Sequence, residues 1–308
     1  MKYCMLKDMR ASRVVMGCMR IADKTLAQTE KVMIEALQAG VNMFDLADVY
    51  GAGDCERIFG VAIRDLEIPR KDYVLQTKCG IHKDAEGKIL GFDFSKEHIL
   101  ASVEGSLKRL NTDYIDILLL HRPDTLMDPD EVAAAFEKLR EDGKVRAFGV
   151  SNMSAMQMQL LKGSGVEIIA NQMQFSPMHT ALVDSGFNVN MYKDESTMRA
   201  GDCLEYCRLR GISLQAWSPF QYGFFEGSIL DKEKFPALNA ELEHLAEKYD
   251  CTPAAIVLAW ILRHPAFAQT VTGPTSPEHM KELCRAADIT LTREEWYSLY
   301  LSTGKKLP

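Results

Sequence analysis

Eight short apolar runs recur along the chain, and a stretch with helical periodicity follows each of them. The runs are residues 14–17, 41–45, 73–78, 115–121, 145–150, 168–172, 212–217 and 267–272. Such alternation predicts parallel strands that are joined by right-handed helical crossovers. Eight units in 308 residues favour an α/β fold of the (β/α)8 TIM barrel type, formed by residues 1–308 as a single domain.

Apolar residues three or four positions apart predict the helices between these runs. An open doubly wound sheet fits the sequence less well, because no Gly-x-Gly-x-x-Gly follows the first strand. Asp54 is expected to cap the second helix, and the residues up to Ala11 are expected to form a short edge or plug. The expected helices are residues 29–39, 54–69, 95–110, 129–142, 154–161, 197–210, 253–263 and 277–286, with a terminal helix from residue 292.

Three connections are longer than the others. Residues 79–94, 173–196 and 218–237 follow the third, sixth and seventh predicted strands. They therefore leave the carboxyl end of the barrel, where the active sites of this fold lie. Long loops commonly carry function, so we expect these three to build the walls of a substrate site.

The composition argues against several classes of partner. The formal net charge is −7 with both signs interspersed and no basic cluster, which argues against nucleic-acid binding. No apolar run approaches the ~20 residues of a membrane span, and no secretory signal is visible at the start. The eight cysteines are scattered without a Cys-x-x-Cys. This pattern is typical of reduced thiols in a cytoplasmic protein and gives little support to a metal site.

Four polar side chains lie at the ends of neighbouring predicted strands. Asp45 ends the second strand with Tyr50 five residues beyond it, Lys78 ends the third and His121 the fourth. Parallel strands end at one rim, so we expect these side chains to meet. Lys78 would lower the pKa of Tyr50 from ~10 toward neutrality, which would make the phenol a proton donor. Asp45 would balance the buried ammonium, and His121 could hydrogen-bond a carbonyl oxygen.

Each of these residues also has a simpler interpretation. Asp45 could be a capping acid, and Tyr50 could be a loop aromatic. Lys78 could be a solvated strand end, and His121 could close its strand with one hydrogen bond. Their joint placement at one end of one barrel favours a catalytic site over four separate structural roles.

The predicted chemistry also needs a hydride donor. No side chain donates hydride, so a nicotinamide cofactor is required. Ser151, Asn152 and Gln172 end the fifth and sixth strands, and their hydroxyl and amide groups suit a carboxamide. Trp217 ends the seventh strand and offers an aromatic face to a pyridine ring. Trp217 taken alone is more typical of a core residue than of a stacking platform.

The motifs at these strand ends resemble those of the aldo-keto reductase family. They match in order and spacing over nearly the whole chain. Details such as KCGI at 78–81 and HRPD at 121–124 resemble a bacterial branch of predicted oxidoreductases. The motifs are DLADVYG at 45–51, TK at 77–78, LLLHRP at 118–123, GKVRAFGVSN at 143–152 and WSPF at 217–220.

The resemblance implies a (β/α)8 barrel that reduces aldehydes or ketones with NADP(H). In the family's pattern Tyr50 is the general acid, Lys78 and Asp45 tune it, and His121 orients the carbonyl. Trp217 would stack on the nicotinamide, and residues 218–221 would pass along the pyrophosphate. The cofactor-binding residues that we expect are Met19, Arg20, Ser151, Asn152, Gln172, Trp217, Ser218, Pro219, Phe220, Gln221, Gly273, Thr275, Ser276 and His279.

The chain departs from the family pattern after the eighth strand. Many members carry a lysine at the position of Gly273 and an arginine at that of His279, which grip the adenosine 2′-phosphate. Thr275, Ser276 and the amino end of the helix from Pro277 could still bind this phosphate. NADPH is the expected cofactor, and NADH or dual use is the alternative.

Two other functions are compatible with parts of this pattern. A regulatory barrel, like the reductase-shaped accessory subunits of potassium channels, would keep the cofactor residues and turn over slowly. A metal-dependent barrel hydrolase would need a His-x-His or paired-carboxylate ligand set, which the sequence lacks. The substrate beyond a small carbonyl compound is not encoded in any motif, and a monomer or weak dimer is assumed.

Overall fold

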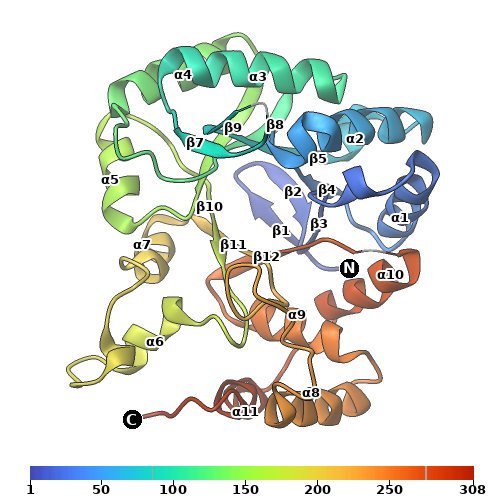
Figure 1. The fold of residues 1–308 in the computed structure, drawn as a ribbon, viewed down its shortest axis with the longest axis vertical. Helices are drawn as coiled ribbons and strands as arrows, with labels where there is room; N and C mark the ends of the chain where they lie inside the picture. Colours follow the sequence, from blue (N-terminus) through green and yellow to red (C-terminus); the bar gives the residue numbers. More distant parts are fainter. Residues whose placement is uncertain (85, 275) are drawn as a thin grey trace.

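The computed structural model describes residues 1–84, 86–274 and 276–308, in which eight parallel strands form a closed barrel (Figure 1). Consecutive barrel strands lie side by side, and the last pairs with the first to close the ring. The predicted (β/α)8 fold is therefore confirmed. The strands, in order around the barrel, are β3 (Val14–Gly17), β4 (Met43–Asp45), β5 (Val74–Cys79), β8 (Ile115–Leu120), β9 (Val145–Ser151), β10 (Ala170–Gln174), β11 (Ser213–Trp217) and β12 (Phe267–Thr272).

Helices surround the barrel on its outside (Figure 1). Their apolar faces pack on the strands. For example, Trp260 of the helix Pro253–Arg263 stacks on Phe175, just beyond β10, with ring centroids 5.1 Å apart, and Phe175 stacks on Phe267 of β12 at 4.4 Å. The helices are α1 (Leu26–Gln38), α2 (Asp54–Asp65), α3 (Lys96–Leu110), α4 (Pro129–Glu141), α5 (Ala155–Gly163), α6 (Ala181–Phe187), α7 (Cys203–Arg210), α8 (Pro236–Lys248), α9 (Pro253–Arg263), α10 (Pro277–Cys284) and α11 (Arg293–Ser302).

The start and the end of α2 differ from the prediction. Asp54 does not cap the helix but is its first residue, and Gly53 precedes it with a φ of 91°. A left-handed φ of this kind favours glycine, so the turn before the helix decides where it begins. The helix ends at Asp65 and not at Pro69, because Glu67 adopts a φ of 54° that no helix continues through.

The predicted helix at residues 197–210 is also shorter than expected. Gly201 and Asp202 have φ values of 57° and 53°, so α7 begins only at Cys203. Helices α6 and α8 lie in segments where no helix was predicted.

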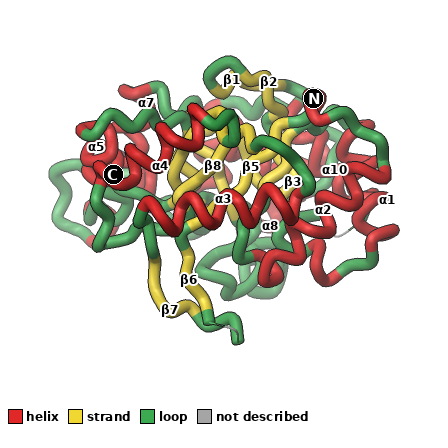
Figure 2. Tube along the Cα trace, turned by 90° about the horizontal axis from the view of Figure 1, so that it is seen from above, coloured by secondary structure: helices red, strands yellow, loops and turns green. Residues whose placement is uncertain are grey.

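Two hairpins mark the opposite ends of the barrel (Figure 2). Strands β1 (Tyr3–Leu6) and β2 (Met9–Ser12) pair antiparallel, and their buried Leu6 and Met9 pack with inward side chains of the barrel strands. This hairpin is the predicted plug. Strands β6 (Ile81–Lys83) and β7 (Ile89–Phe92) form a second hairpin inside the long connection after β5, where no strands were predicted.

The three long connections leave the carboxyl end of the strands, as predicted. The second carries α6, and the third is held by an isolated bridge between Gln221 and Ser228. No helix in the described ranges combines the length and apolar character that a bilayer crossing needs. All eight cysteines lie among the described residues, and none forms a disulfide.

Candidate active site

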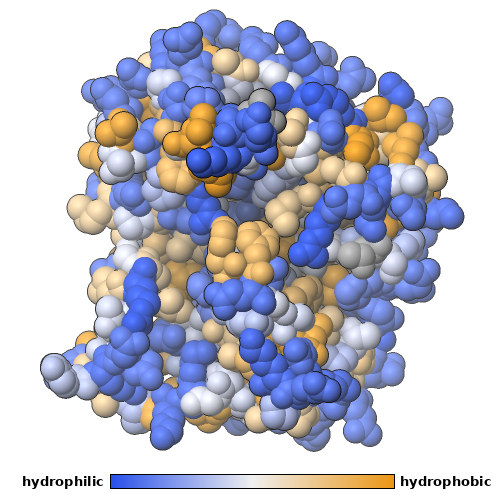
Figure 3. All heavy atoms as spheres, in the orientation of Figure 1, coloured by the Kyte–Doolittle hydropathy of each residue, from blue (hydrophilic) through white to orange (hydrophobic). Residues whose placement is uncertain are grey.

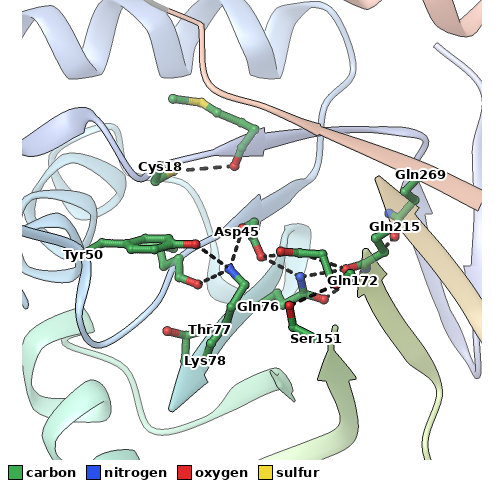
Figure 4. Close-up of polar contacts among 12 residues, drawn as sticks. Cys18, Asp45, Tyr50, Gln76, Thr77, Lys78, Ser151, Gln172, Gln215 and Gln269 are labelled. Atoms are coloured by element: carbon green, nitrogen blue, oxygen red, sulfur yellow. Dashed lines mark hydrogen bonds and ion pairs between the residues drawn. The ribbon is translucent and has the colours of Figure 1, made fainter. Parts of the chain in front are cut away.

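A buried lysine stands at the centre of the site (Figure 4). Lys78 lies on β5 with no exposed surface, and its ammonium contacts three acceptors. The Nζ atom lies 2.7 Å from Asp45 Oδ2, 2.7 Å from the carbonyl oxygen of Leu46 and 3.2 Å from Tyr50 Oη. Because β4 and β5 are paired neighbours, the end of β4 delivers the carboxylate and the following loop returns the phenol. The structure thus brings Asp45, Tyr50 and Lys78 together, as the sequence predicted.

The charge on Lys78 is held in place by its partners. Burial disfavours the ammonium, but the attraction of Asp45 and the contacts with Tyr50 outweigh it, so the pKa of Lys78 is raised above its usual value. Asp45 keeps its second oxygen engaged through amide donors from Gln76 at 2.6 Å and Gln172 at 3.0 Å. The pair therefore remains a fully hydrogen-bonded ion pair, which is the condition for a stable buried charge.

Tyr50 is presented by a tight turn of 3₁₀ type, Tyr50–Gly53. Gly51 has a φ of 54°, and a Cβ atom there would lie 2.8 Å from the Cβ of Ala22. Both features exclude ordinary side chains at this position. The turn consequently holds the phenol ring in one place, over the Lys78 ammonium at 5.0 Å from the ring centroid.

The acidity of Tyr50 differs from the prediction. Burial raises the pKa of Tyr50, and the opposing effects of Lys78 and Arg122 do not overcome it. The expected fall toward neutrality is therefore wrong for this state of the protein. The phenol therefore stays protonated at neutral pH, with the Lys78 ammonium beside its oxygen.

His121 follows β8 and approaches the tyrosine edge-on. The two ring centroids are 5.7 Å apart with an interplanar angle of 83°. Burial, together with the positive charges of Lys78, Arg122 and Lys83, holds the pKa of His121 well below its usual value. The imidazole is therefore neutral at physiological pH, and its buried Nδ1 has no hydrogen-bond partner in the described part of the chain.

A cavity of about 980 Å³ opens above these side chains on the face shown in Figure 3. Lys78 lies behind its wall. Ser276 and His279 stand at the amino end of α10 outside the lining, where the Ser276 hydroxyl accepts from the His279 backbone N–H at 3.2 Å. Thr275 lies outside the described residues. The predicted residues that line the cavity are Met19, Arg20, Asp45, Tyr50, His121, Ser151, Asn152, Gln172, Trp217, Ser218, Pro219, Phe220, Gln221 and Gly273.

The polar side chains on the far wall of the cavity are bonded to one another. Trp217 Nε1 donates to Asn152 Oδ1 at 3.1 Å, and Asn152 Nδ2 donates to Ser151 Oγ at 2.7 Å. Ser151 in turn donates to the backbone carbonyl of Gln172 at 3.0 Å. Asn152 and Ser218 adopt φ values of 56° and 47°, which cost energy for side-chain-bearing residues and concentrate at functional sites. A pre-ordered polar wall therefore faces Tyr50 and His121.

Sequence reasoning missed a network of glutamines under the site. Gln215 exchanges hydrogen bonds with Gln76 at 3.0 and 3.1 Å and donates to Gln269 at 2.8 Å. Gln172 also donates to Gln215, at 3.1 Å. These amides come from β5, β10, β11 and β12, are buried, and connect Asp45 to the opposite wall of the barrel. A glutamine inside each of three apolar runs, 73–78, 212–217 and 267–272, together with Gln172 at the end of a fourth, is the signal that could have revealed them.

A second buried acidic group lies behind the loop that carries Tyr50. Glu56 accepts from Thr77 Oγ1 at 2.6 Å and from Arg109 Nε at 2.7 Å. Asp48 stands nearby, and its buried Oδ1 has no partner among the described residues. Burial, followed by repulsion from Glu56, raises the pKa of Asp48 from 3.8 to about 7.

This shift predicts how stability depends on pH. Between 3.8 and about 7 folded Asp48 holds a proton that the unfolded chain has lost, so the free energy of unfolding should fall as pH rises through this window. In Asp48→Asn the free energy of unfolding should depend less on pH. At pH 8 it should exceed that of wild type by on the order of 2 kcal/mol, after allowance for solvent screening. Urea unfolding from pH 4 to 8 measures it. The exposed Asp72→Asn is the control, and parallel curves for wild type and Asp48→Asn would contradict the assignment.

Comparisons with known proteins found matches over most of the chain. The sequence profile of the Aldo/keto reductase family matches residues 13–300. Oxidoreductase YdhF of Escherichia coli (strain K12) is 35% identical over 294 residues, which cover 94% of this chain and 92% of YdhF. Uncharacterized oxidoreductase YcsN of Bacillus subtilis (strain 168) is 33% identical over 312 residues, which cover 98% of each chain. NADH-specific methylglyoxal reductase of Escherichia coli (strain K12) is 29% identical over 290 residues, which cover 84% of this chain and 82% of the reductase.

The resemblance noted from the strand-end motifs is therefore confirmed. Bacterial oxidoreductases are among the relatives, and the match extends from the first barrel strand into the last helix. The closed barrel and the tyrosine held over a buried lysine–aspartate pair stand within the matched region. On the combined strength of sequence and fold, this chain belongs to the aldo/keto reductase family of oxidoreductases.

Proposed function

We propose that this protein reduces the carbonyl group of an aldehyde or ketone with a nicotinamide cofactor, and that Tyr50 supplies the proton. The observation that carries the proposal is the Tyr50 phenol at the edge of the cavity, 3.2 Å from a buried ammonium that Asp45 holds at 2.7 Å. A proton donor of this kind serves a reaction in which negative charge develops on an oxygen. Carbonyl reduction is such a reaction.

The cavity is lined by polar and aromatic side chains of the kinds that would bind a nicotinamide cofactor. The indole of Trp217 and the hydrogen-bonded amides of Asn152 and Gln172 line one wall, and residues 218–221 with Gly273 continue it toward α10. Aromatic and amide groups would hold the pyridine carboxamide, and this loop would run beside the phosphates. When bound, the reduced cofactor supplies hydride to the carbonyl carbon.

The remaining chemistry belongs to the side chains. A carbonyl oxygen in the cavity would accept hydrogen bonds from Tyr50 and from the neutral His121. As the carbon gains hydride, the oxygen takes the Tyr50 proton and becomes a hydroxyl group. Lys78 stabilises the resulting phenolate, Asp45 keeps Lys78 in position, and solvent returns a proton to Tyr50.

Turnover with a panel of small aldehydes and ketones, followed through cofactor absorbance, tests this proposal. Cofactor binding is measured separately through tryptophan fluorescence. Turnover with any carbonyl, accompanied by formation of the alcohol, supports the reductase. Tight cofactor binding without turnover on the whole panel would instead favour the regulatory barrel. No binding of either nicotinamide cofactor would contradict both functions.

The cofactor preference follows from the segment after β12. Gly273 and His279 supply no permanent cation, and the Ser276 hydroxyl already accepts a helix N–H. We propose that NADPH is used and that NADH is accepted as well. The name of one relative, NADH-specific methylglyoxal reductase, states the use of NADH for that protein. An arginine contact with the 2′-phosphate would favour NADPH by about tenfold, and this chain lacks it. The Michaelis constants of the two cofactors should therefore lie within about tenfold of each other.

The variant His279→Arg provides the matched test of this preference. It should lower the Michaelis constant for NADPH by about tenfold through a charge-assisted contact with the 2′-phosphate and leave that for NADH unchanged. A wild-type Michaelis constant for NADPH orders of magnitude below that for NADH would contradict dual use.

A further inference from the structure

The cavity lining carries an excess of positive charge. Arg20, Lys83 and Arg122 line it, whereas Asp45 is the acidic residue of the lining among the described residues. Lys78 already neutralises Asp45 through the buried ion pair. The space above Tyr50 and His121 is thus a cationic environment before any ligand enters.

Arg122 is the cation of the cavity lining that stands beside a residue of the catalytic group. It follows His121 directly, and its guanidinium lies over the rings of Trp217 and Phe224, 5.2 and 5.5 Å from their centroids. Its side chain is half-buried, and no described residue provides a hydrogen-bond acceptor or a carboxylate within ion-pair distance of it. A half-buried guanidinium that rests on aromatic faces lacks the planar oxygen partner for which its five donors are suited.

The strand order separates Arg122 from the expected phosphate segment of the cofactor. Arg122 follows β8, and in the closed ring of eight strands β8 lies four strands from β12 in either direction. Gly273 and α10 follow β12, on the opposite side of the mouth. Lys83 projects from β6 in the connection after β5, which is the neighbour of β8. These two cations therefore stand away from the expected phosphate segment, and Arg122 reaches the edge of the expected nicotinamide wall at Trp217.

Apolar side chains complete this side. Ile89 and Phe92 of the β7 strand and Phe224 and Phe225 of the loop after β11 line the cavity, and all four side chains are exposed. Figure 3 shows apolar atoms gathered around the hollow. A ligand with an apolar skeleton would cover surface that otherwise faces water.

We infer that the substrate is a carbonyl compound with an anionic oxygen-bearing group, a carboxylate or a phosphate, which Arg122 binds in a bidentate manner with help from Lys83. This inference rests on the proposed reductase function. The carbonyl lies at Tyr50 and His121, the anionic group lies at Arg122, and the apolar skeleton between them packs on the aromatic wall. Arg122 then acts as a specificity residue and does not itself carry the transferred proton.

A matched pair of aldehydes isolates the charge. The acid 4-carboxybenzaldehyde and its methyl ester share one ring and one reacting carbonyl, and the ester is the more electrophilic of the two. A preference for the acid must therefore come from binding. Glyceraldehyde 3-phosphate against glyceraldehyde tests the phosphate. We expect wild type to favour at least one anionic partner by about tenfold or more in kcat/KM, as hydrogen bonds to a charged group imply.

Variants assign the preference to Arg122. Arg122→Met should bring the ratio of acid to neutral substrate close to one by raising KM for the acid, and Arg122→Lys should give an intermediate ratio because it keeps the charge without the planar fork. The control is Arg293→Met on α11, an exposed arginine outside the cavity lining, which should keep the wild-type ratio.

The outcomes separate this inference from the function on which it rests. Turnover of neutral aldehydes without any anionic preference would overturn the inference and leave the reductase standing. A preference that survives Arg122→Met while KM for NADPH rises would place Arg122 on the cofactor and also overturn it. If no carbonyl is reduced, calorimetry with 4-carboxybenzyl alcohol and the cofactor decides. Binding that depends on Arg122 supports the anion site, and its absence overturns it.

Discussion

Replacing Tyr50 with phenylalanine is expected to lower kcat for carbonyl reduction by about a factor of 10²–10⁴, the usual contribution of a general acid. The ring and its contact with His121 remain, but the hydroxyl that Lys78 holds at 3.2 Å is lost. The KM for the cofactor should change little, because the hydroxyl is not part of the expected dinucleotide wall. Steady-state kinetics with the best substrate of the panel measure both quantities.

Tyr114→Phe is the matched control for this prediction. Tyr114 directly precedes β8 and therefore lies at the amino end of the barrel, away from the cavity lining. Its variant should keep wild-type kcat. Equal losses in both variants would trace the effect to general damage, and a Tyr50→Phe enzyme with wild-type kcat would refute the role of the phenol.

Lys78→Met should reduce both activity and stability. The variant removes the ammonium that stabilises the developing phenolate, so kcat should fall by about 10²–10³. It also leaves the Asp45 carboxylate buried without its cation, which should cost about 3–5 kcal/mol of the free energy of unfolding. Activity assays and urea unfolding of the same preparation measure the two effects.

The double variant Asp45→Asn with Lys78→Met distinguishes catalysis from folding. A neutral amide no longer needs a counter-charge, so much of the lost stability should return. The kcat should stay low, because the ammonium that contacts the Tyr50 hydroxyl is gone. Recovery of kcat together with stability would mean that Lys78 serves only to fold the barrel mouth.

The meeting of Asp45 and Lys78 could be predicted because it depends only on fold topology. Once the eight strand–helix units were recognised, the ends of neighbouring strands had to share a rim, and the carboxylate and ammonium had to find one another. Strand β12 had even its bounds predicted, at Phe267–Thr272.

The pKa of Tyr50 could not be predicted because it is a balance between opposing effects. The sequence shows that a cation is near, but only the packed structure shows how far burial outweighs that cation. Hydrogen-bond partners were equally hidden. Asn152 bonds Trp217 and Ser151, and Gln172 donates to Asp45, because the closed barrel brings distant strand ends together.

Local turn geometry accounts for the missed element bounds. Asp54 carries a good capping side chain, yet Gly53 occupies the left-handed position that starts α2. The β6–β7 hairpin was hidden in a glycine-dotted connection, where short strands of mixed polarity have no clear period.

The most direct test of the whole account is a single turnover with the reduced cofactor pre-bound, in which alcohol formation is followed for wild type and Tyr50→Phe. We predict one alcohol formed for each cofactor oxidised in wild type, and the same cofactor affinity with a rate lower by about 10² or more in the variant. Equal single-turnover rates, or cofactor oxidation without alcohol, would contradict the assignment of Tyr50 as the proton donor.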